Sequence, residues 1–487
     1  MRGENNMVKN FPKVQLTCVV FAIVAVLCLH DNPCGITFPL FVAATGFAGI
    51  ILMRFSDVTV KKESLFYLAA AFLLGISTVL TMSSLLIVFN KIFIFFLFVM
   101  FLLCNYYDDS RWNLPKCIEM IFNMLILSIG SIGRPFTDKK KYREMFCEGQ
   151  PEKNSRVKYV LIGLLICIPV IGIVLPLLAN ADAVFAEQLR KIFEDLSVWW
   201  FFKHIFGMAF TGFIIYMVTY MWTAWLGKRS YSTYTEHTPK GEPIVGITIS
   251  SVLCLIYIVF CFIQIRYLFL GGKLSLPDGT TYASYARKGF FELLFVSAIN
   301  VLLVLIETFC FRKSRVLNAL MTVITVCTYI IIASSTIRML MYIQYKYLTF
   351  LRVLVLVLLA AIAILLFGVF LHIFNKDFRI FKYSVVVVTV IYIIFASSKP
   401  DYWIAKINTD NMDPMTQYSF FAETEPYDDI SYLNGLSIDA APVLLNCDAL
   451  TESELSGFNR KVAKKASEPG VFSWNLSRYL AYRYSKQ

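Results

Sequence analysis

The side chains of this sequence that could bind or react are charged groups at the ends of long apolar runs. Seven of them lie on one predicted side of these runs and form a candidate outer polar cluster: Asp182, Lys203, Arg266, Arg287, Glu292, Arg338 and Arg352. A carboxylate at a membrane surface can pair with an ammonium or guanidinium group through charge-assisted hydrogen bonds. We expect Glu292 to line an outer vestibule with the four arginines as its partners, while pairing that only joins helix ends is the simpler interpretation. No catalytic residue is predicted among the seven.

A polar stripe follows one of the apolar runs. Glu292, Asn300 and Glu307 lie eight and seven positions apart in the run 289–311, and residues at these spacings share nearly one helix face. Such a stripe must face other helices or a water-filled cavity, because lipid offers it no hydrogen bonds. We expect Glu307, at the far end of the run, to meet Arg312 and Arg315.

Compact catalytic and cofactor motifs are missing from the sequence. It contains no phosphate-binding GxxxxGK[ST], no GxGxxG that opens a helix, and no hydrolase GxSxG or HExxH. The histidines lack a second ligand three or four positions away and predict no metal site: His30, His204, His237 and His372. We therefore expect no cofactor, no metal and a non-enzymatic function.

The elements that must position these residues are membrane spans. Apolar residues make up 58% of the 487-residue chain and charged residues 16%, against about 25% charged in ordinary soluble proteins. We predict an all-α polytopic helical membrane protein with about eleven transmembrane helices and a small C-terminal extramembrane helical domain. The expected spans are 14–30, 34–53, 64–82, 84–104, 158–178, 197–226, 244–266, 289–311, 316–337, 351–373 and 382–398.

Lys and Arg residues concentrate in the loops on one side of these spans. The positive-inside rule then places the N-terminus in the cytoplasm and the tail from about residue 399 outside a multi-pass inner (cytoplasmic) membrane. This distribution explains the net charge of +12 without a nucleic-acid partner. The segment 116–134 is apolar enough to cross, but Glu119 and Asn123 share one of its faces. We predict that it lies in the cytoplasmic interface or is half-inserted into the membrane.

Three regions follow from this topology: an N-terminal membrane region (1–157), a membrane core (158–398) and an extracytoplasmic C-terminal domain (399–487). The first half of the tail, 401–454, holds eleven acidic residues and one lysine. We expect these acids to pair with the basic helix at 460–465, and a calcium site is the second interpretation.

Local motifs in the tail predict helices. Thr451 and Glu454 in TESE have the spacing of a capping box before a helix. Helical patterning is also present in DISYLNGLSIDAAPVLL, which belongs to the acidic half of the tail.

Several passages resemble a widespread bacterial family of polytopic membrane proteins known as a domain of unknown function. They are ANADAVFAE (179–187), TYASYARKGFFELL (281–294), SSTIRMLMYIQYKYLTFLR (334–352), YLNGLSIDAAP (432–442) and WNLSR (474–478). The resemblance covers roughly residue 158 to the end. The chain departs from the family pattern at Lys346 and Tyr347, where a Tyr-Gly step is expected, and this departure argues against a tight turn there. The family implies the membrane fold and no established activity.

Two function classes remain. We expect an integral membrane protein of the bacterial cell envelope that moves a small solute or holds its outer tail as a sensing or docking element. Membrane lipids, and an envelope protein or a small solute, are then its partners. The alternative is a membrane-embedded transferase that acts on a lipid-linked substrate from the outer side.

Overall fold

The computed structural model consists of helices in the part of the chain that it describes. That part comprises 7–30, 32, 34–109, 112–146, 206–228, 240–266, 282–411, 427–466, 470 and 472–486, with scattered positions from 167 to 204. The one strand-like feature among these residues is an isolated bridge between Gly241 and Phe311. Eleven helices in them are long and apolar enough to cross a membrane. The prediction of an all-α polytopic membrane protein is confirmed.

The helices are longest in the membrane region and short in the tail. In chain order they are α2 (Phe11–Leu29), α3 (Thr37–Phe55), η1 (Lys62–Ser64), α4 (Leu65–Leu80), α5 (Ser84–Tyr106), α6 (Leu114–Leu127), η2 (Ser128–Ser131), α7 (Arg134–Phe146), α11 (Gly207–Gly227), α12 (Pro243–Gln264), α13 (Tyr282–Cys310), α14 (Arg315–Lys346), α15 (Phe350–Phe374), α16 (Ile380–Ser397), α17 (Pro400–Asp410), α18 (Tyr427–Gly435), η5 (Ile438–Ala440), α19 (Ala441–Leu444), α20 (Ser456–Lys465) and α21 (Leu476–Tyr484).

Ten of the eleven candidate spans coincide with expected ones, and one differs. The expected span 158–178 lies almost entirely outside the described residues, as does the expected boundary between 157 and 158. The eleventh candidate is instead Leu114–Ser131, part of the segment for which we predicted an interfacial position. Its exposed residues Leu114, Ile118 and Phe122 recur every four positions, so an apolar stripe runs along one face of α6.

One compact unit of the chain is built from Met1–Asp31, Ala43–Val60 and Met120–Ser230. Within it, α2 packs against α11, and α7 contacts both helices. The buried Tyr220 of α11 donates a hydrogen bond from its hydroxyl to Asp138 Oδ2 of α7, at 3.1 Å. This contact joins a membrane helix to a short helix rich in lysine.

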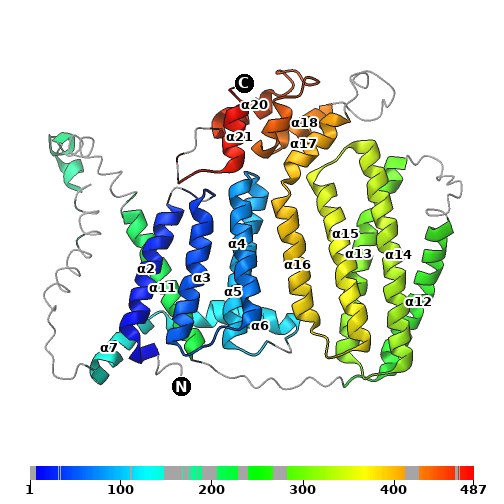
Figure 1. Cartoon of the computed structure of the whole chain (residues 1–487), viewed down its shortest axis with the longest axis horizontal. Helices are drawn as coiled ribbons and strands as arrows, with labels where there is room; N and C mark the ends of the chain where they lie inside the picture. Colours follow the sequence, from blue (N-terminus) through cyan, green and yellow to red (C-terminus); the bar gives the residue numbers. More distant parts are fainter. Residues whose placement is uncertain are drawn as a thin grey trace. The chain divides into compact units, whose positions relative to one another are not determined.

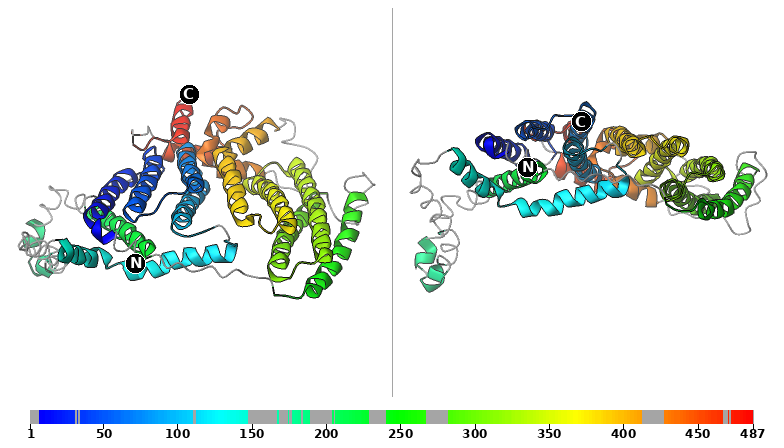
Figure 2. Two further views of the ribbon diagram at one scale, coloured as in Figure 1. Left: turned by 60° about the horizontal axis from the view of Figure 1, so that its bottom comes forward. Right: turned by 90° about the horizontal axis from the view of Figure 1, so that it is seen from below.

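The second compact unit contains Asn32–Val42, Lys61–Glu119 and Tyr231–Gln487. Its spans form a row in which α5 packs on α4, α4 on α16, α16 on α15, and α15 on α13 and α14, with α12 against α14 (Figure 1). The same row is seen from below in Figure 2. The α12–α14 polar site and the Asp439 contact described below both lie in this second unit.

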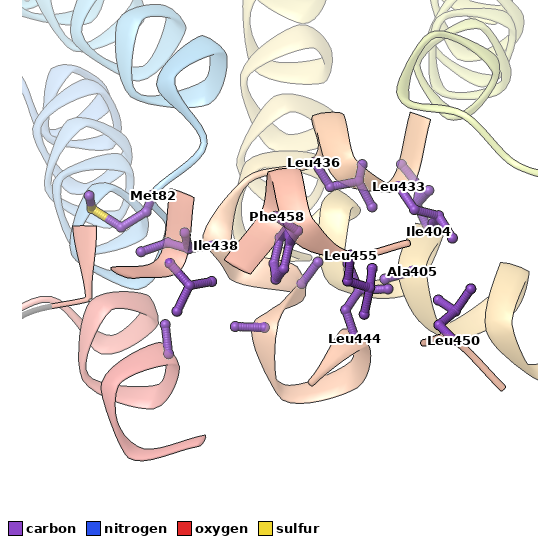
Figure 3. Close-up of a cluster of buried hydrophobic side chains, with 14 residues drawn as sticks. Met82, Ile404, Ala405, Leu433, Leu436, Ile438, Leu444, Leu450, Leu455 and Phe458 are labelled. Carbon is purple, nitrogen blue, oxygen red and sulfur yellow. The ribbon is translucent and has the colours of Figure 1, made fainter. Parts of the chain in front are cut away.

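In the described part of the tail after α16, the chain forms five short α-helices, α17–α21. Their buried apolar residues form one core (Figure 3), to which the α4–α5 turn contributes Met82. Phe458 of α20 is fully buried in this core, together with Leu433 of α18 and Ile404 of α17. The expected domain boundary at 398/399 lies between α16 and α17.

A tight turn does join α14 to α15, although the departure from the Tyr-Gly step argued against one. Tyr347 has φ 60° and ψ 174°, a conformation that only glycine adopts readily. Asn408 holds the next residue in place, because its Oδ1 accepts from the Leu348 backbone N and its Nδ2 donates to the Leu348 carbonyl, each at 2.9 Å. The Arg352 guanidinium also donates to the Tyr347 carbonyl. Tyrosine therefore occupies a glycine position under strain.

Replacing Tyr347 with glycine is expected to stabilise the protein by about 1 kcal/mol, because the strain of about 1–3 kcal/mol disappears while the unfolded chain gains some freedom. Thermal unfolding of the purified protein in detergent measures this. Tyr347→Ala is the control, since alanine keeps the Cβ that causes the strain. Equal melting temperatures for the Gly and Ala variants would refute the explanation.

Candidate intramembrane polar site

Polar side chains line one face of α12 inside the membrane region. Ser250, Tyr257 and Gln264 lie seven positions apart, so they follow one face of the helix. Each of them hydrogen-bonds to α13 or α14. The α12–α14 bundle thus contains three polar levels spread along most of its length.

The first level is a carboxyl group in the interior of the bundle. Glu307 of α13 is 3% exposed, and the Ser250 hydroxyl lies 2.6 Å from its Oε1 and 2.8 Å from its Oε2. The expectation that Glu307 meets Arg312 and Arg315 is wrong. Arg312 lies 3.5 Å from Glu242 instead, at the surface, because Arg312 falls beyond the end of α13 whereas Glu307 is turned into the bundle.

The second and third levels use neutral acceptors. Asn300 bridges two helices, since its Oδ1 accepts from the Tyr257 hydroxyl at 2.7 Å and its Nδ2 donates to Thr328 Oγ1 at 2.9 Å. At the third level, Gln264 Oε1 accepts from Ser334 Oγ at 2.7 Å and from Arg338 Nη2 at 3.2 Å. A guanidinium and an amide therefore close the end of the bundle opposite Glu307.

Arg338 needs a glycine beside it. A Cβ at Gly289 of α13 would clash with the Arg338 guanidinium. The hydroxyl of Ser335 donates to the Phe290 carbonyl at 3.2 Å, which draws the same part of α13 towards α14. The close approach of these two helices allows Arg338 to lie buried between them.

The structure gathers only part of the predicted outer cluster. Arg338 is buried in the site, whereas Glu292 is exposed on α13 and Arg266 is exposed just after the end of α12. Arg352 stacks on Tyr342, with 4.3 Å from its guanidinium carbon to the ring centroid. Asp182 is exposed, and its Oδ1 accepts from the Val184 backbone N at 2.8 Å.

Two members of that cluster cannot be placed. Lys203 lies outside the described residues, as does the side chain of Arg287, although its backbone belongs to α13. The outer vestibule around Glu292 stays a prediction.

A second buried polar group joins the tail to the membrane helices. The Asp439 carboxylate accepts from the Thr81 hydroxyl and from the Met82 backbone N, the latter at 2.7 Å. Burial raises the pKa of the Asp439 carboxyl above its ordinary value, and burial also lowers the pKa of the nearby Lys399. The tail is therefore docked on the α4–α5 turn through a desolvated contact.

The basic helix of the tail does not bind carboxylates among the described side chains. Lys461 donates to the carbonyls of Asn434, Gly435 and Leu436 at 2.8–3.0 Å, so it caps the C-terminal end of α18. Lys461 thus departs from the expected pairing of 401–454 with 460–465.

A comparison with protein families identifies the domain to which most of this chain belongs. The model of DUF4153, a domain of unknown function, matches residues 68–447. The chain belongs to this family. The DUF4153 match begins well before residue 158, where we expected the resemblance to start, and ends before the WNLSR passage. It contains the α12–α14 polar site and Asp439. No curated protein and no solved structure matches the chain.

The α12 half of the polar site was missed in the sequence, although a signal for it exists. Ser250, Tyr257 and Gln264 repeat at the same interval of seven that relates Asn300 to Glu307. Polar residues that repeat every seven positions in two apolar runs form a polar face on each helix. Because such faces avoid lipid and hydrogen-bond to each other, this shared period would have predicted that α12 and α13 face each other.

Proposed function

We propose that this membrane protein is non-enzymatic and moves a small solute, such as a proton or a small cation, along the α12–α14 bundle. The observation that carries the proposal is Glu307, a carboxyl inside a candidate span whose hydrogen-bond partner among the described side chains is the Ser250 hydroxyl. An ionisable residue in a spanning helix costs about 2.5–3.5 kcal/mol on insertion scales and typically marks an ion or substrate path.

The second and third polar levels continue from Glu307 along the bundle and could form a path for the solute. Asn300 and Gln264 supply amide oxygens, and Tyr257, Thr328 and Ser334 supply hydroxyl groups. These are groups that can replace part of an ion's hydration shell when the helix contacts open. Arg338 at the far end would repel cations, so a cation path must open beside this residue rather than through it.

The test is ion flux into vesicles. Protein reconstituted in vesicles with an internal pH-sensitive dye, under a potassium diffusion potential, should take up protons faster than empty vesicles. Glu307→Gln should reduce the flux to the level of empty vesicles, because the amide cannot exchange a proton. Glu242→Gln is the matched control, since Glu242 is exposed at the start of α12, and it should retain the flux.

Two results would contradict this transport proposal. One is parent protein with no flux of protons, sodium or potassium above empty vesicles, and the other is Glu307→Gln with the parent's flux. The alternative of a transferase on a lipid-linked substrate would be consistent with the first result.

Envelope sensing or scaffolding is the second candidate function, and the docked tail favours it. The Asp439 contact fixes the C-terminal domain on the α4–α5 turn, so a ligand of the tail would have a direct route to the spans. If the tail senses, variants that undock it should change flux or growth without loss of the membrane bundle. Undocked variants with the parent's flux and growth would rule this function out.

We further propose the orientation that the loop charges predict, with the N-terminus in the cytoplasm and the tail outside an inner membrane of the cell envelope. A cysteine in place of the exposed Ser456 should react with an impermeant thiol reagent on intact cells. A cysteine in place of Lys140, whose side chain is also exposed, should react only after lysis. Labelling of the parent protein gives the background, and labelling at Lys140 in intact cells would reverse the assignment.

A further inference from the structure

The loop 472–475 of the tail is held at the level where three membrane helices end. Asn475 Nδ2 donates to the carbonyls of Cys34, Thr78 and Thr81 at 3.1–3.4 Å, and Ser477 Oγ donates to the Leu80 carbonyl at 2.7 Å. These carbonyls lie just before α3, at the end of α4 and just before α5. The loop is therefore positioned at the boundary between the spans and water.

An apolar ring projects from this loop. Phe472 is 75% exposed, the largest exposed fraction among the large apolar side chains of the described residues. Its carbonyl accepts from Asn32 Nδ2 and would lie only 2.6 Å from a Cβ at Gly35. The backbone is thus packed tightly against the start of α3 while the ring has no cover.

A pair of exposed apolar side chains lies at the same end of the bundle, on α17. This helix starts three residues after α16 ends, and Lys399 turns the chain between them with φ 52°. Trp403 and Ile407 of α17 are 49% and 40% exposed and one helical turn apart. Lys406 Nζ lies 5.6 Å from the Trp403 ring centroid.

We propose that the C-terminal domain is anchored in the lipid leaflet at its own end of the spans, by Phe472 from the loop and by Trp403 and Ile407 from α17. Aromatic side chains favour the membrane interface, and apolar residues at this depth enter the boundary between headgroups and acyl chains. The Lys406 ammonium is placed to reach lipid phosphates beside Trp403. The occupant of this surface is the bilayer itself.

The experiment is photo-crosslinking of the full chain. Benzoylphenylalanine is introduced singly at Phe472, at Trp403 and, as a control, at the exposed Arg460 of α20. Each protein is reconstituted in nanodiscs of phosphatidylethanolamine and phosphatidylglycerol with deuterated acyl chains. Each variant is first compared with the parent by gel filtration and melting temperature. If the variant at one test position does not fold, the variant at the other position still tests the proposal. After irradiation, mass spectrometry identifies the adduct at each position.

Deuterated lipid adducts at 472 and 403, with none at 460, are the expected result. Lipid adducts at all three positions would overturn the proposal, because they would show no selective anchor. Adducts to a second copy of the chain at 472 and 403, or no adduct at either position, would also overturn it, since the rings would then face protein or water.

Discussion

Asp109→Asn is expected to lower the free energy of unfolding by about 2 kcal/mol, because the buried Asp109 carboxylate binds two lysines and loss of a charge-assisted hydrogen bond costs about 1.5–3 kcal/mol. Asp109 follows α5, and its side chain is 7% exposed. Its Oδ2 lies 2.9 Å from Lys382 Nζ of α16, and its Oδ1 lies 3.5 Å from Lys61 Nζ. This carboxylate thus joins three parts of the second unit at the end opposite the tail.

Glu63→Gln is a matched control in the same network. Glu63 Oε2 also lies 2.9 Å from Lys382 Nζ, but the Glu63 side chain is 70% exposed. An exposed ion pair contributes about 0–1 kcal/mol, since water screens it, so this variant should melt close to the parent. Thermal unfolding in detergent at low salt measures both variants. Equal decreases in melting temperature for the two variants would show that burial does not determine how much each ion pair with Lys382 contributes to stability.

Asn475→Ala is expected to weaken docking of the C-terminal domain by about 3 kcal/mol. Asn475 Oδ1 accepts from the backbone N of Ser477 and Arg478 and so caps α21, and loss of a cap costs about 1 kcal/mol. Its Nδ2 also serves the three carbonyls of the membrane turns, and leaving such buried acceptors unpaired costs about 1–3 kcal/mol. Hydrogen exchange at the Met82 amide reports docking directly, because that N–H is bound by Asp439.

Two further variants separate undocking from unfolding. Asn475→Asp keeps the cap and replaces the donor with a carboxylate oxygen that is repelled by the three carbonyls, so the Met82 amide should still lose protection. Asn434→Asp changes a similar residue inside the domain, where Asn434 donates to the Glu454 carbonyl and accepts from the Phe458 N. The Asn434→Asp variant should destabilise the core of the C-terminal domain rather than its contact with the membrane helices. An Asn475→Asp variant with the parent's protection at Met82 would show that the cap alone matters.

Local sequence determined the membrane class, most of the spans and the chemistry of the capping motifs. Hydropathy located the spans because lipid requires about twenty apolar residues in a row, whatever the neighbouring helices are. The hydrogen bonds expected of the TESE motif do form, as Glu454 Oε2 accepts from the Thr451 N at 2.8 Å, but they close a turn before α20, whose N-cap residue is Leu455. The seven-residue period placed Asn300 and Glu307 on one helix face, and both are buried.

Tertiary structure alone decided the partners. A helical period says which residues share a face but not which helix that face meets, so Glu307 was assigned to nearby arginines and is bonded to the distant Ser250. The contact of Asp439 with Thr81 spans most of the chain and has no local signal. Tyr347 takes a glycine conformation because Asn408, sixty residues later, binds the backbone beside it. Such contacts depend on how the helices pack together, a property of the whole fold rather than of any one segment.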